Sequence, residues 1–144
     1  MMHDITIRAA SRDDAVELAA LLTRQGAPTD PASVIARLGR LEATGLDQVL
    51  IAEARDQLVG LVSLHITPAL ISHEGPSARI TVLAVAEGEA RGAVGERLVA
   101  AVEELARAVG CAGIEASSDD GASVAEFYAT IGYSRSHSLF HKLL

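Results

Sequence analysis

The segment LAVAEGEARGAVGERL, residues 83–98, contains residue types at a spacing that could bind a phosphate. An apolar run ends at Val85, a glycine-containing turn follows, and a helical pattern begins near Gly92. The first turn of a helix has backbone N–H groups without intrahelical partners and carries a partial positive charge. Glycine lets a phosphate come close to those groups. The segment predicts a diphosphate cradle or, equally, a tight turn whose glycines serve only the chain reversal.

Two common phosphate loops are excluded. The pattern G-x-x-x-x-G-K-[ST] needs a lysine in the loop, and the only lysine of the chain is Lys142. The G-x-G-x-x-G pattern of dinucleotide-binding folds is missing as well. A cradle in residues 83–98 would therefore use the backbone of a different loop.

The histidines and the single cysteine predict no metal site. The five histidines show no ligand spacing, because His137 and His141 would lie roughly 13 Å apart on an extended strand. Cys111 is the only cysteine, which excludes an internal disulfide and a cysteine-rich zinc site. It opens a buried strand and is interpreted as a small core residue.

Composition and charge indicate a globular protein. Of the 144 residues, 49% are hydrophobic and 22% are charged, which argues against disorder. The net charge of −7 disfavours a nucleic-acid partner, because binding a phosphate backbone needs a positive surface. No apolar run approaches the roughly 18 to 20 residues that cross a membrane, and the first residues do not resemble a signal peptide. We therefore expect a cytoplasmic protein that binds neither membranes nor nucleic acids.

The N-terminal half predicts one strand, two helices and a hairpin. Apolar and polar residues alternate first, as in a half-buried strand. Capping residues then begin each helix and a glycine ends it. Two runs rich in β-branched residues, three residues apart, predict the hairpin. The expected elements are strand 5–8, a helix from Ser11 to Gly26, a helix from Asp30 to Gly45, and strands 48–54 and 58–66.

The C-terminal half predicts strands and helices in alternation. A nearly continuous apolar run is typical of a central strand, and helical spacing follows it. The expected elements are strand 78–86, a helix ending at Gly110, strand 111–117, a helix over about 121–131, and a terminal strand over 133–144. The order β-α-α-β-β-β-α-β-α-β predicts an α/β (α+β) fold in which helices flank a mixed central sheet. Residues 1–144 are expected to form one domain, with parallel strands joined by a right-handed crossover over 78–117.

Two motifs together resemble the GNAT superfamily of acetyl-CoA-dependent N-acetyltransferases. The segment from Val85 to Leu98 is similar to the family's pyrophosphate loop R-G-x-G-[IV]-G-x-x-L after a strand that ends in valine. The run from Phe127 to Tyr133 resembles F-Y-x-x-[LI]-G-[FY] at the expected distance, and residues 110–115 also fit. The order of elements matches the family over essentially the whole chain.

This resemblance implies a site for acetyl-CoA. In the family, the pantetheine arm pairs with the strand before the loop, between two parallel strands that splay apart, and an amine attacks the thioester directly. The acceptor would be a primary amine of a small molecule or peptide, and no metal is implied. The residues implied in cofactor binding are Leu83, Ala84, Val85, Arg91, Gly92, Ala93, Val94, Gly95 and Glu96.

The resemblance implies that Tyr128 is the general acid that protonates the leaving thiolate, with a core aromatic as the alternative. The general base stays open among Glu53, His65, His73, Glu74 and a water relay. The acceptor side is expected at the loop from Gln25 to Asp30, with Arg24 and Asp30 as candidate contacts. A homodimer is also expected from the habit of the family.

The loop departs from the family pattern at two positions. Ala90 stands where the family has Arg or Gln, and Ala93 stands where it has glycine. Glu87, Glu89 and Glu96 add negative charge beside a polyanionic ligand. A second hypothesis is therefore a non-catalytic binding or regulatory protein of the same fold, with a degenerate cofactor loop.

Overall fold

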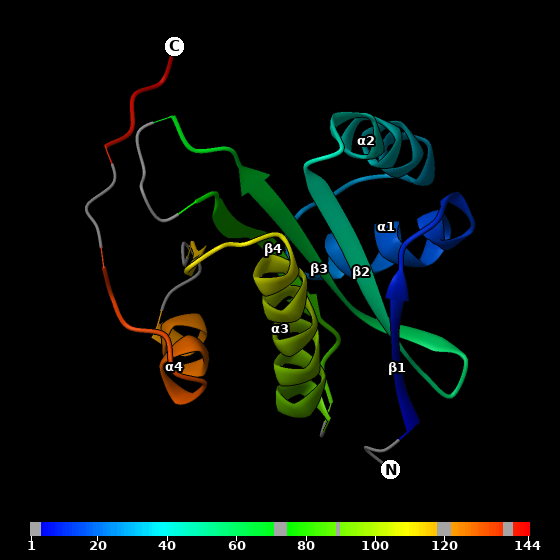
Figure 1. The fold of residues 1–144 in the computed structure, drawn as a ribbon. Coiled ribbons are helices and arrows are strands. Elements are labelled where there is room, and N and C mark those ends of the chain that lie inside the picture. The colour runs from blue at the N-terminus through cyan, green and yellow to red at the C-terminus, as the bar shows by residue number, and fades with distance from the viewer. Residues whose placement is uncertain (1–3, 71–74, 89, 118–121, 137–139) are drawn as a thin grey trace.

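The computed structural model describes residues 4–70, 75–88, 90–117, 122–136 and 140–144 (Figure 1). Its helices and strands follow the expected order up to the last helix. They are β1 (Ile5–Ala9), a 3-10 turn (Arg12–Asp14), α1 (Ala15–Arg24), α2 (Pro31–Thr44), β2 (Asp47–Ala54), β3 (Gln57–Thr67), β4 (Ser77–Val85), α3 (Arg91–Ala108), β5 (Ile114–Ala116) and α4 (Ala122–Thr130).

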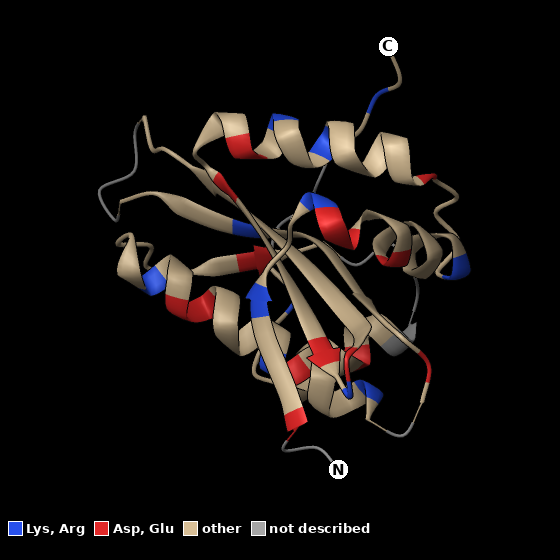
Figure 2. Ribbon diagram, turned by 90° about the vertical axis from the view of Figure 1, so that its right-hand side faces the viewer, with Lys and Arg blue, Asp and Glu red and all other residues tan. Residues whose placement is uncertain are grey.

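A five-stranded sheet in the order β1-β2-β3-β4-β5 lies between two layers of helices. Helices α1 and α2 cover one face and bury an apolar cluster that includes Leu21, Ile51 and Leu61. Helices α3 and α4 cover the other face, over a cluster that includes Leu64 and Leu98. Figure 2, viewed from the β1 side, shows helices on both sides of the sheet. The expected fold class, a mixed sheet flanked by helices, is confirmed.

The sheet is antiparallel from β1 to β4 and parallel between β4 and β5. Helix α3 connects the two parallel strands. The crossover expected over residues 78–117 is thus confirmed as one that joins parallel strands.

Local signals fix the helix ends. Asp30 accepts a hydrogen bond from the N–H of Ser33 at 2.8 Å, and Gly45 ends α2 in the left-handed conformation with φ of 69°.

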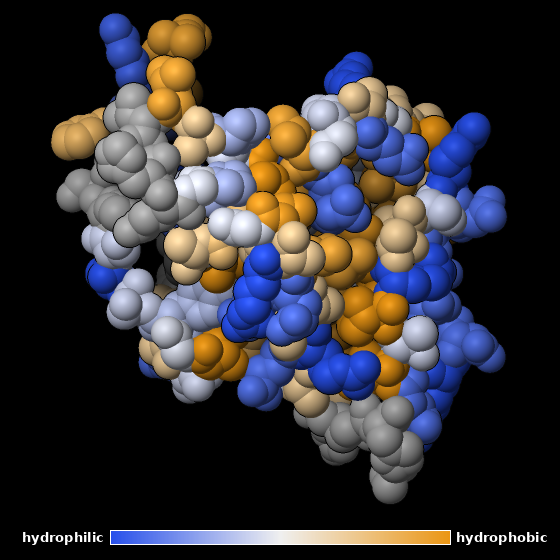
Figure 3. All heavy atoms as spheres, viewed as in Figure 1, coloured by the Kyte–Doolittle hydropathy of each residue, from blue (hydrophilic) through white to orange (hydrophobic). Residues whose placement is uncertain are grey.

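The terminal strand expected over residues 133–144 is wrong for the residues that the structure describes there. Residues 133–136 and 140–144 belong to no strand, and residues 137–139 lie outside the description. The outermost strand on that side is β5, which has three residues and offers too short a ladder for a further strand. Phe140 and Leu143 are therefore exposed, and apolar side chains protrude at the C-terminal end in Figure 3.

Candidate active site

Strands β4 and β5 pair over only three positions and then separate. The pairs are Ala78 with Ile114, Arg79 with Glu115, and Ile80 with Ala116. Strand β4 continues to Val85, whereas β5 ends at Ala116. The edge of β4 beyond Ile80 is thus not paired with β5. We call the side of residues 81–85 that faces away from β3 the wedge.

A β-bulge in β4 lies at the start of this wedge. The register with β3 shifts between Ser63 and Leu64, which leaves Thr81 as the extra residue of β4. The Thr81 hydroxyl donates a hydrogen bond to the Ser63 carbonyl at 3.2 Å. The bulge turns the last part of β4 relative to its first part, where β5 is paired.

The backbone groups of Leu83 and Val85 point into the wedge. The N–H of Ala86 donates to the Val59 carbonyl of β3 at 2.8 Å, and antiparallel ladders alternate between bonded and non-bonded residues. Ala84 therefore bonds to β3, while the N–H and C=O groups of Leu83 and Val85 face away from β3. Of the three β4 residues implied in cofactor binding, two expose backbone groups to the wedge. The third, Ala84, is buried under α1 and α2.

The head of α3 supplies two further donors. The helix begins at Arg91, so the N–H groups of Gly92 and Ala93 have no acceptor four residues earlier within it. From Val94 onward the helix satisfies its own N–H groups, beginning with the bond from Val94 to the Ala90 carbonyl at 2.9 Å. The predicted residues Val94, Gly95 and Glu96 thus have their amides engaged inside the helix.

The two glycines of the loop have different surroundings. A side chain built on Gly92 would meet nothing within 4 Å, so Gly92 leaves open space at the helix head. A Cβ on Gly95 would lie 3.0 Å from Cζ of Phe127 on α4. Gly95 therefore lets α4 pack closely on α3, a role that the sequence did not reveal. Val94 is only 2% exposed and belongs to the core.

Arg91 is the one cation among the predicted loop residues. Its guanidinium contacts the Glu87 carboxylate at 3.1 Å, and both side chains are largely exposed. Exposed pairs of this kind contribute little and exchange partners readily. An apolar hollow of about 70 Å³ lies beside the helix head, lined in part by Ala86, Gly88 and Ala90. Ala90, at the position where the family has Arg or Gln, is partly buried against the core.

Tyr128 has a buried ring and an accessible hydroxyl. The residue is 7% exposed, and its ring lies 5.4 Å from that of Phe127 and 5.1 Å from that of Tyr133. Burial raises the pKa of Tyr128 to about 12. The described residues provide no hydrogen bond to this hydroxyl, and among them no fully buried side-chain oxygen lacks a partner. The hydroxyl therefore reaches the surface and can donate a proton or a hydrogen bond there.

Tyr133 fixes α4 against α3. Its hydroxyl donates to the Glu103 carboxylate at 2.8 Å, across the two helices. Burial, and then this carboxylate, raise the pKa of Tyr133 well above its usual value. No separate role is predicted for Tyr133 from the motif, although Tyr133 is the last residue of the run that begins at Phe127.

The structure describes two of the four candidate bases, Glu53 and His65, and each contacts a different partner. Glu53 is paired with Arg8 of β1 at 2.6 Å, on the side of the sheet remote from β4. His73 and Glu74 lie outside the described residues. His65 Nδ1 lies 2.9 Å from Asp47 Oδ1, and its ring is about one third exposed. The Thr44 hydroxyl lies 2.6 Å from the other oxygen of the Asp47 carboxylate.

His65 lies on the face of the sheet that α1 and α2 cover only in part. Its neighbours Leu64 and Ile66 face α3, so alternation places the His65 ring on the opposite face. The register puts Asp47, His65, Arg79 and Glu115 in one row across four strands. Arg79 pairs with Glu115 at 2.8 Å, and the row lies just before the wedge opens.

The loop from Gln25 to Asp30 approaches the end of β4. The Gln25 side-chain nitrogen Nε2 lies 3.2 Å from the Val85 carbonyl oxygen. Sequence analysis did not predict this contact, because no local pattern indicates a bond between residues 60 positions apart. Asp30 caps α2, and Arg24 is exposed at the end of α1.

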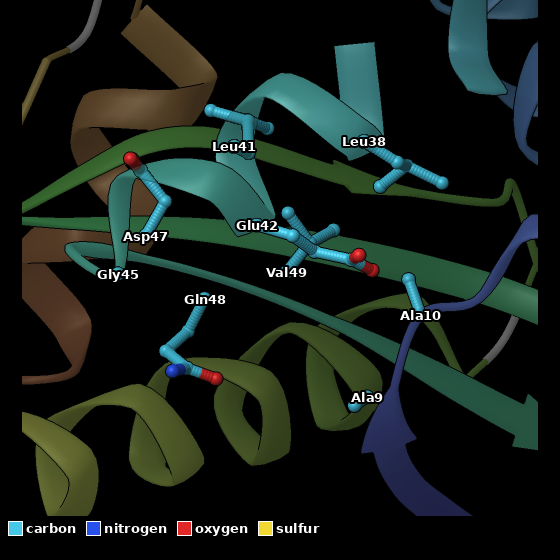
Figure 4. Close-up of a pocket in the computed structure, with 9 residues that line it drawn as sticks. All are labelled: Ala9, Ala10, Leu38, Leu41, Glu42, Gly45, Asp47, Gln48 and Val49. Atoms are coloured by element: carbon cyan, nitrogen blue, oxygen red, sulfur yellow. The ribbon is translucent and has the colours of Figure 1, made fainter. Parts of the chain in front are cut away.

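The larger of the two hollows described here lies away from the wedge. It has a volume of about 200 Å³ and is lined by residues of β1, β2 and α2, among them Leu38, Glu42 and Val49 (Figure 4). None of its lining residues comes from β4 or α3.

Within the described ranges, no group of three or more His, Cys, Asp or Glu side chains could hold a metal ion. Nor does this part of the chain contain a helix with the length and apolar character that crossing a membrane requires.

Solved structures with the same fold include named acetyltransferases. A GNAT family acetyltransferase from Staphylococcus aureus is 21% identical, with 98% of this chain and 99% of that chain covered and a TM-score of 0.80. Glucosamine-6-phosphate N-acetyltransferase from Arabidopsis thaliana is 17% identical over 96% and 97%, with a TM-score of 0.78. A transcriptional regulator from Bacillus halodurans is 22% identical over 97% and 99%, with a TM-score of 0.84.

Sequence comparison identifies the family. No curated protein sequence matches the chain. Residues 15–133, which include the wedge, the head of α3 and the aromatic motif, match the acetyltransferase (GNAT) family. The resemblance seen in the two motifs is thus confirmed: the chain belongs to the acetyltransferase (GNAT) family.

Proposed function

We propose that this protein transfers an acetyl group from acetyl-CoA to a primary amine of a small molecule or peptide. The observation that carries the proposal is the edge of β4 beyond Ile80, which β5 does not pair and which leads to a helix head whose first N–H groups have no acceptor within the helix. An extended arm can pair with Leu83 and Val85 as a strand would. At the same end of the sheet, Gly92 and Ala93 can donate to a diphosphate while Arg91 supplies a positive charge. Family membership supports the reaction class.

The proposed chemistry assigns a separate task to each group. The amine nitrogen bonds to the acyl carbon and the carbon–sulfur bond breaks, which yields an amide and a free thiol. The Leu83 N–H, which faces the wedge, can donate to the oxygen that becomes negative during attack; such donors contribute about 3 kcal/mol. Tyr128 donates a proton to the departing sulfur. Its pKa of about 12 keeps the phenol protonated at neutral pH.

We assign the proton taken from the amine to His65, directly or through water. Its bond with Asp47 favours the tautomer that carries the hydrogen on Nδ1, which leaves the Nε2 lone pair free. The charged groups that face it in the row are Asp47 on β2 and Arg79 on β4. After transfer, His65 releases this proton to solvent, and Tyr128 regains a proton from solvent.

Substitution of His65 tests this assignment. His65→Gln keeps a polar side chain of similar size but cannot take a proton from the amine, so it should lower kcat/KM by about a hundredfold or more. The Kd for acetyl-CoA, measured by titration, should stay near its native value. An unchanged kcat/KM in His65→Gln would assign the base elsewhere.

Calorimetric titration with acetyl-CoA, followed by an acetylation assay on a panel of amines, tests the proposed function. Binding together with thiol release from at least one amine supports it. Binding with no turnover on any amine contradicts the proposed transfer. No binding at millimolar acetyl-CoA contradicts the enzyme assignment and favours the second hypothesis, a non-catalytic binding or regulatory protein with a degenerate cofactor loop. That hypothesis draws on Ala90 and Ala93 in the loop and on the similar fold of a protein named as a transcriptional regulator.

The identity of the amine stays open between a small molecule and a peptide. The excess of 19 acidic over 12 basic residues favours a cationic acceptor. The cytoplasmic location, the homodimer and the single-domain organisation stay predictions.

A further inference from the structure

Gln25 occupies the end of the wedge. It follows the last residue of α1, and its side-chain Nε2 lies 3.2 Å from the Val85 carbonyl oxygen. The alternation along β4 directs this carbonyl away from β3 and into the wedge. The Gln25 carboxamide therefore bonds to one of the few backbone acceptors that the free edge of β4 offers.

This contact is not needed to end the helix. The backbone N–H of Gln25 already bonds to the carbonyls of Leu21 and Leu22, both at 3.1 Å. Gln25 as a whole is exposed, and Gly26 follows it with a φ of 92°. The side chain can therefore leave Val85 without breaking α1 or uncovering the core.

The bond resembles the one that a ligand would make. A carboxamide N–H donating to a strand carbonyl is the interaction by which an amide-containing arm pairs with a sheet edge. The pantetheine arm carries such amides, and in the proposed function it would pair along residues 83–85. Gln25 and the arm thus compete for the same oxygen and for the space beside it.

We propose that Gln25 is a gate residue of the acyl-CoA site, which holds the Val85 carbonyl in the ligand-free protein and is displaced when the arm binds. The inference rests on the proposed function and adds a residue to its site. If the open form is only a fraction of the free protein, the apparent Kd is weakened by that fraction. Removing the carboxamide should then tighten binding.

The test compares the binding of CoA to the native protein, to Gln25→Ala and to Gln25→Asn. Asparagine keeps the carboxamide but is one methylene too short to reach Val85. We expect both variants to bind CoA about two- to tenfold more tightly, because one hydrogen bond of ordinary net strength no longer competes. Stopped-flow binding should assign the gain to a faster association. Gln48→Ala, which removes an exposed glutamine from β2, is the matched control and should bind like the native protein.

The outcomes separate the gate from the proposed function. Native protein that binds CoA, with Gln25→Ala binding equally or more weakly, overturns the gate and leaves the proposed function intact. The absence of binding by all three proteins overturns the proposed function and the gate together. Thermal unfolding of each variant shows whether it is folded. If Gln25→Ala does not fold, a folded Gln25→Asn is sufficient for the decision.

Discussion

In the proposed function, Tyr128 would serve both the core and the chemistry. Its ring packs between Phe127 and Tyr133, while its hydroxyl reaches the surface without a described partner. A purely structural aromatic needs no hydroxyl at such a place, because phenylalanine would fill the same volume. The two readings of Tyr128 can therefore be separated by removing one oxygen atom.

Tyr128→Phe should lower kcat by about 10²- to 10⁴-fold, which is the usual contribution of a general acid. The Kd for acetyl-CoA should stay near its native value, because the ring and its contacts remain. Because the native pKa is about 12, we expect no alkaline fall in rate from Tyr128 across the neutral range. Steady-state kinetics and titration measure both quantities. An unchanged kcat would leave Tyr128 as a core aromatic.

Gly92 is the loop residue at which the diphosphate cradle can be tested without disturbing the fold. Gly92→Glu places a side chain in open space, and an acidic residue in the first turn favours the helix slightly. We expect the thermal midpoint to be unchanged and the Kd for acetyl-CoA to weaken by about tenfold or more, because a carboxylate repels the diphosphate. Gly92→Ala is the control, and it should bind within a few-fold of the native protein. Native-like binding by Gly92→Glu would place the phosphates elsewhere.

At the scale of elements, Asp14 joins β1 to α1. Its two carboxylate oxygens lie 2.7 and 2.9 Å from the guanidinium nitrogens of Arg8, and one of them also accepts from the Ser11 N–H at 2.8 Å. Asp14 is only 5% exposed. The Arg8 guanidinium, and then the Ser11 N–H, hold the pKa of this carboxyl below its usual value of 3.8.

The sign of the pH dependence follows from this lowered pKa. A carboxyl with a depressed pKa in the folded state stabilises the protein above its unfolded pKa, and this stability is lost as the pH falls through the folded value. Asp14→Asn should cost about 1.5 to 3 kcal/mol at pH 7, and the gap to the native protein should narrow below the unfolded pKa of 3.8. Urea unfolding of both proteins across this range measures the gap. A gap that stays constant in acid would show that Asp14 acts without its charge.

The sequence revealed elements that depend on local chemistry and missed contacts that depend on distant partners. Asp30 and Gly45 bound α2 as expected, because capping uses only neighbouring backbone groups. The hairpin was found, although its turn uses Arg55 and Asp56 at positive φ without the usual glycine. The terminal strand failed because alternation along 133–144 cannot tell that β5 is three residues long.

Some residues of the candidate site can likewise be predicted from local sequence, whereas others depend on distant partners. Leu83, Val85, Gly92 and Tyr128 could be named from motifs, because each occupies a fixed place before or within a helix. The packing role of Gly95 depends on Phe127, which is 32 positions away, and only the folded chain brings the two together. The contact of Gln25 with Val85 likewise needs α1 and β4 to meet. Motifs thus indicate which elements border the wedge, whereas the side chains that contact it depend on how the helices pack.

At the scale of the whole molecule, the net charge of −7 would oppose the approach of acetyl-CoA and attract a cationic amine, the two substrates of the proposed function. Figure 2 shows acidic and basic positions interspersed along the ribbon. In the proposed function, acetyl-CoA would approach an acidic protein and then bind through local donors at the head of α3. A cationic amine is drawn by the same field.

In the proposed function, added salt should favour the binding of acetyl-CoA and weaken the binding of a cationic amine. The Debye length falls from about 30 Å at 0.01 M salt to about 8 Å at 0.15 M, so added salt screens the net charge more than the contacts of Arg91 at close range. We expect the association rate constant of acetyl-CoA to rise with salt over this range, whereas the KM of a cationic amine rises because its attraction is weakened. Stopped-flow binding and steady-state kinetics in a salt series measure the two trends, and a neutral amine is the control for the second. An association rate that falls as salt is added would show that the positive potential at the helix head, rather than the charge of the whole chain, governs the approach of the cofactor.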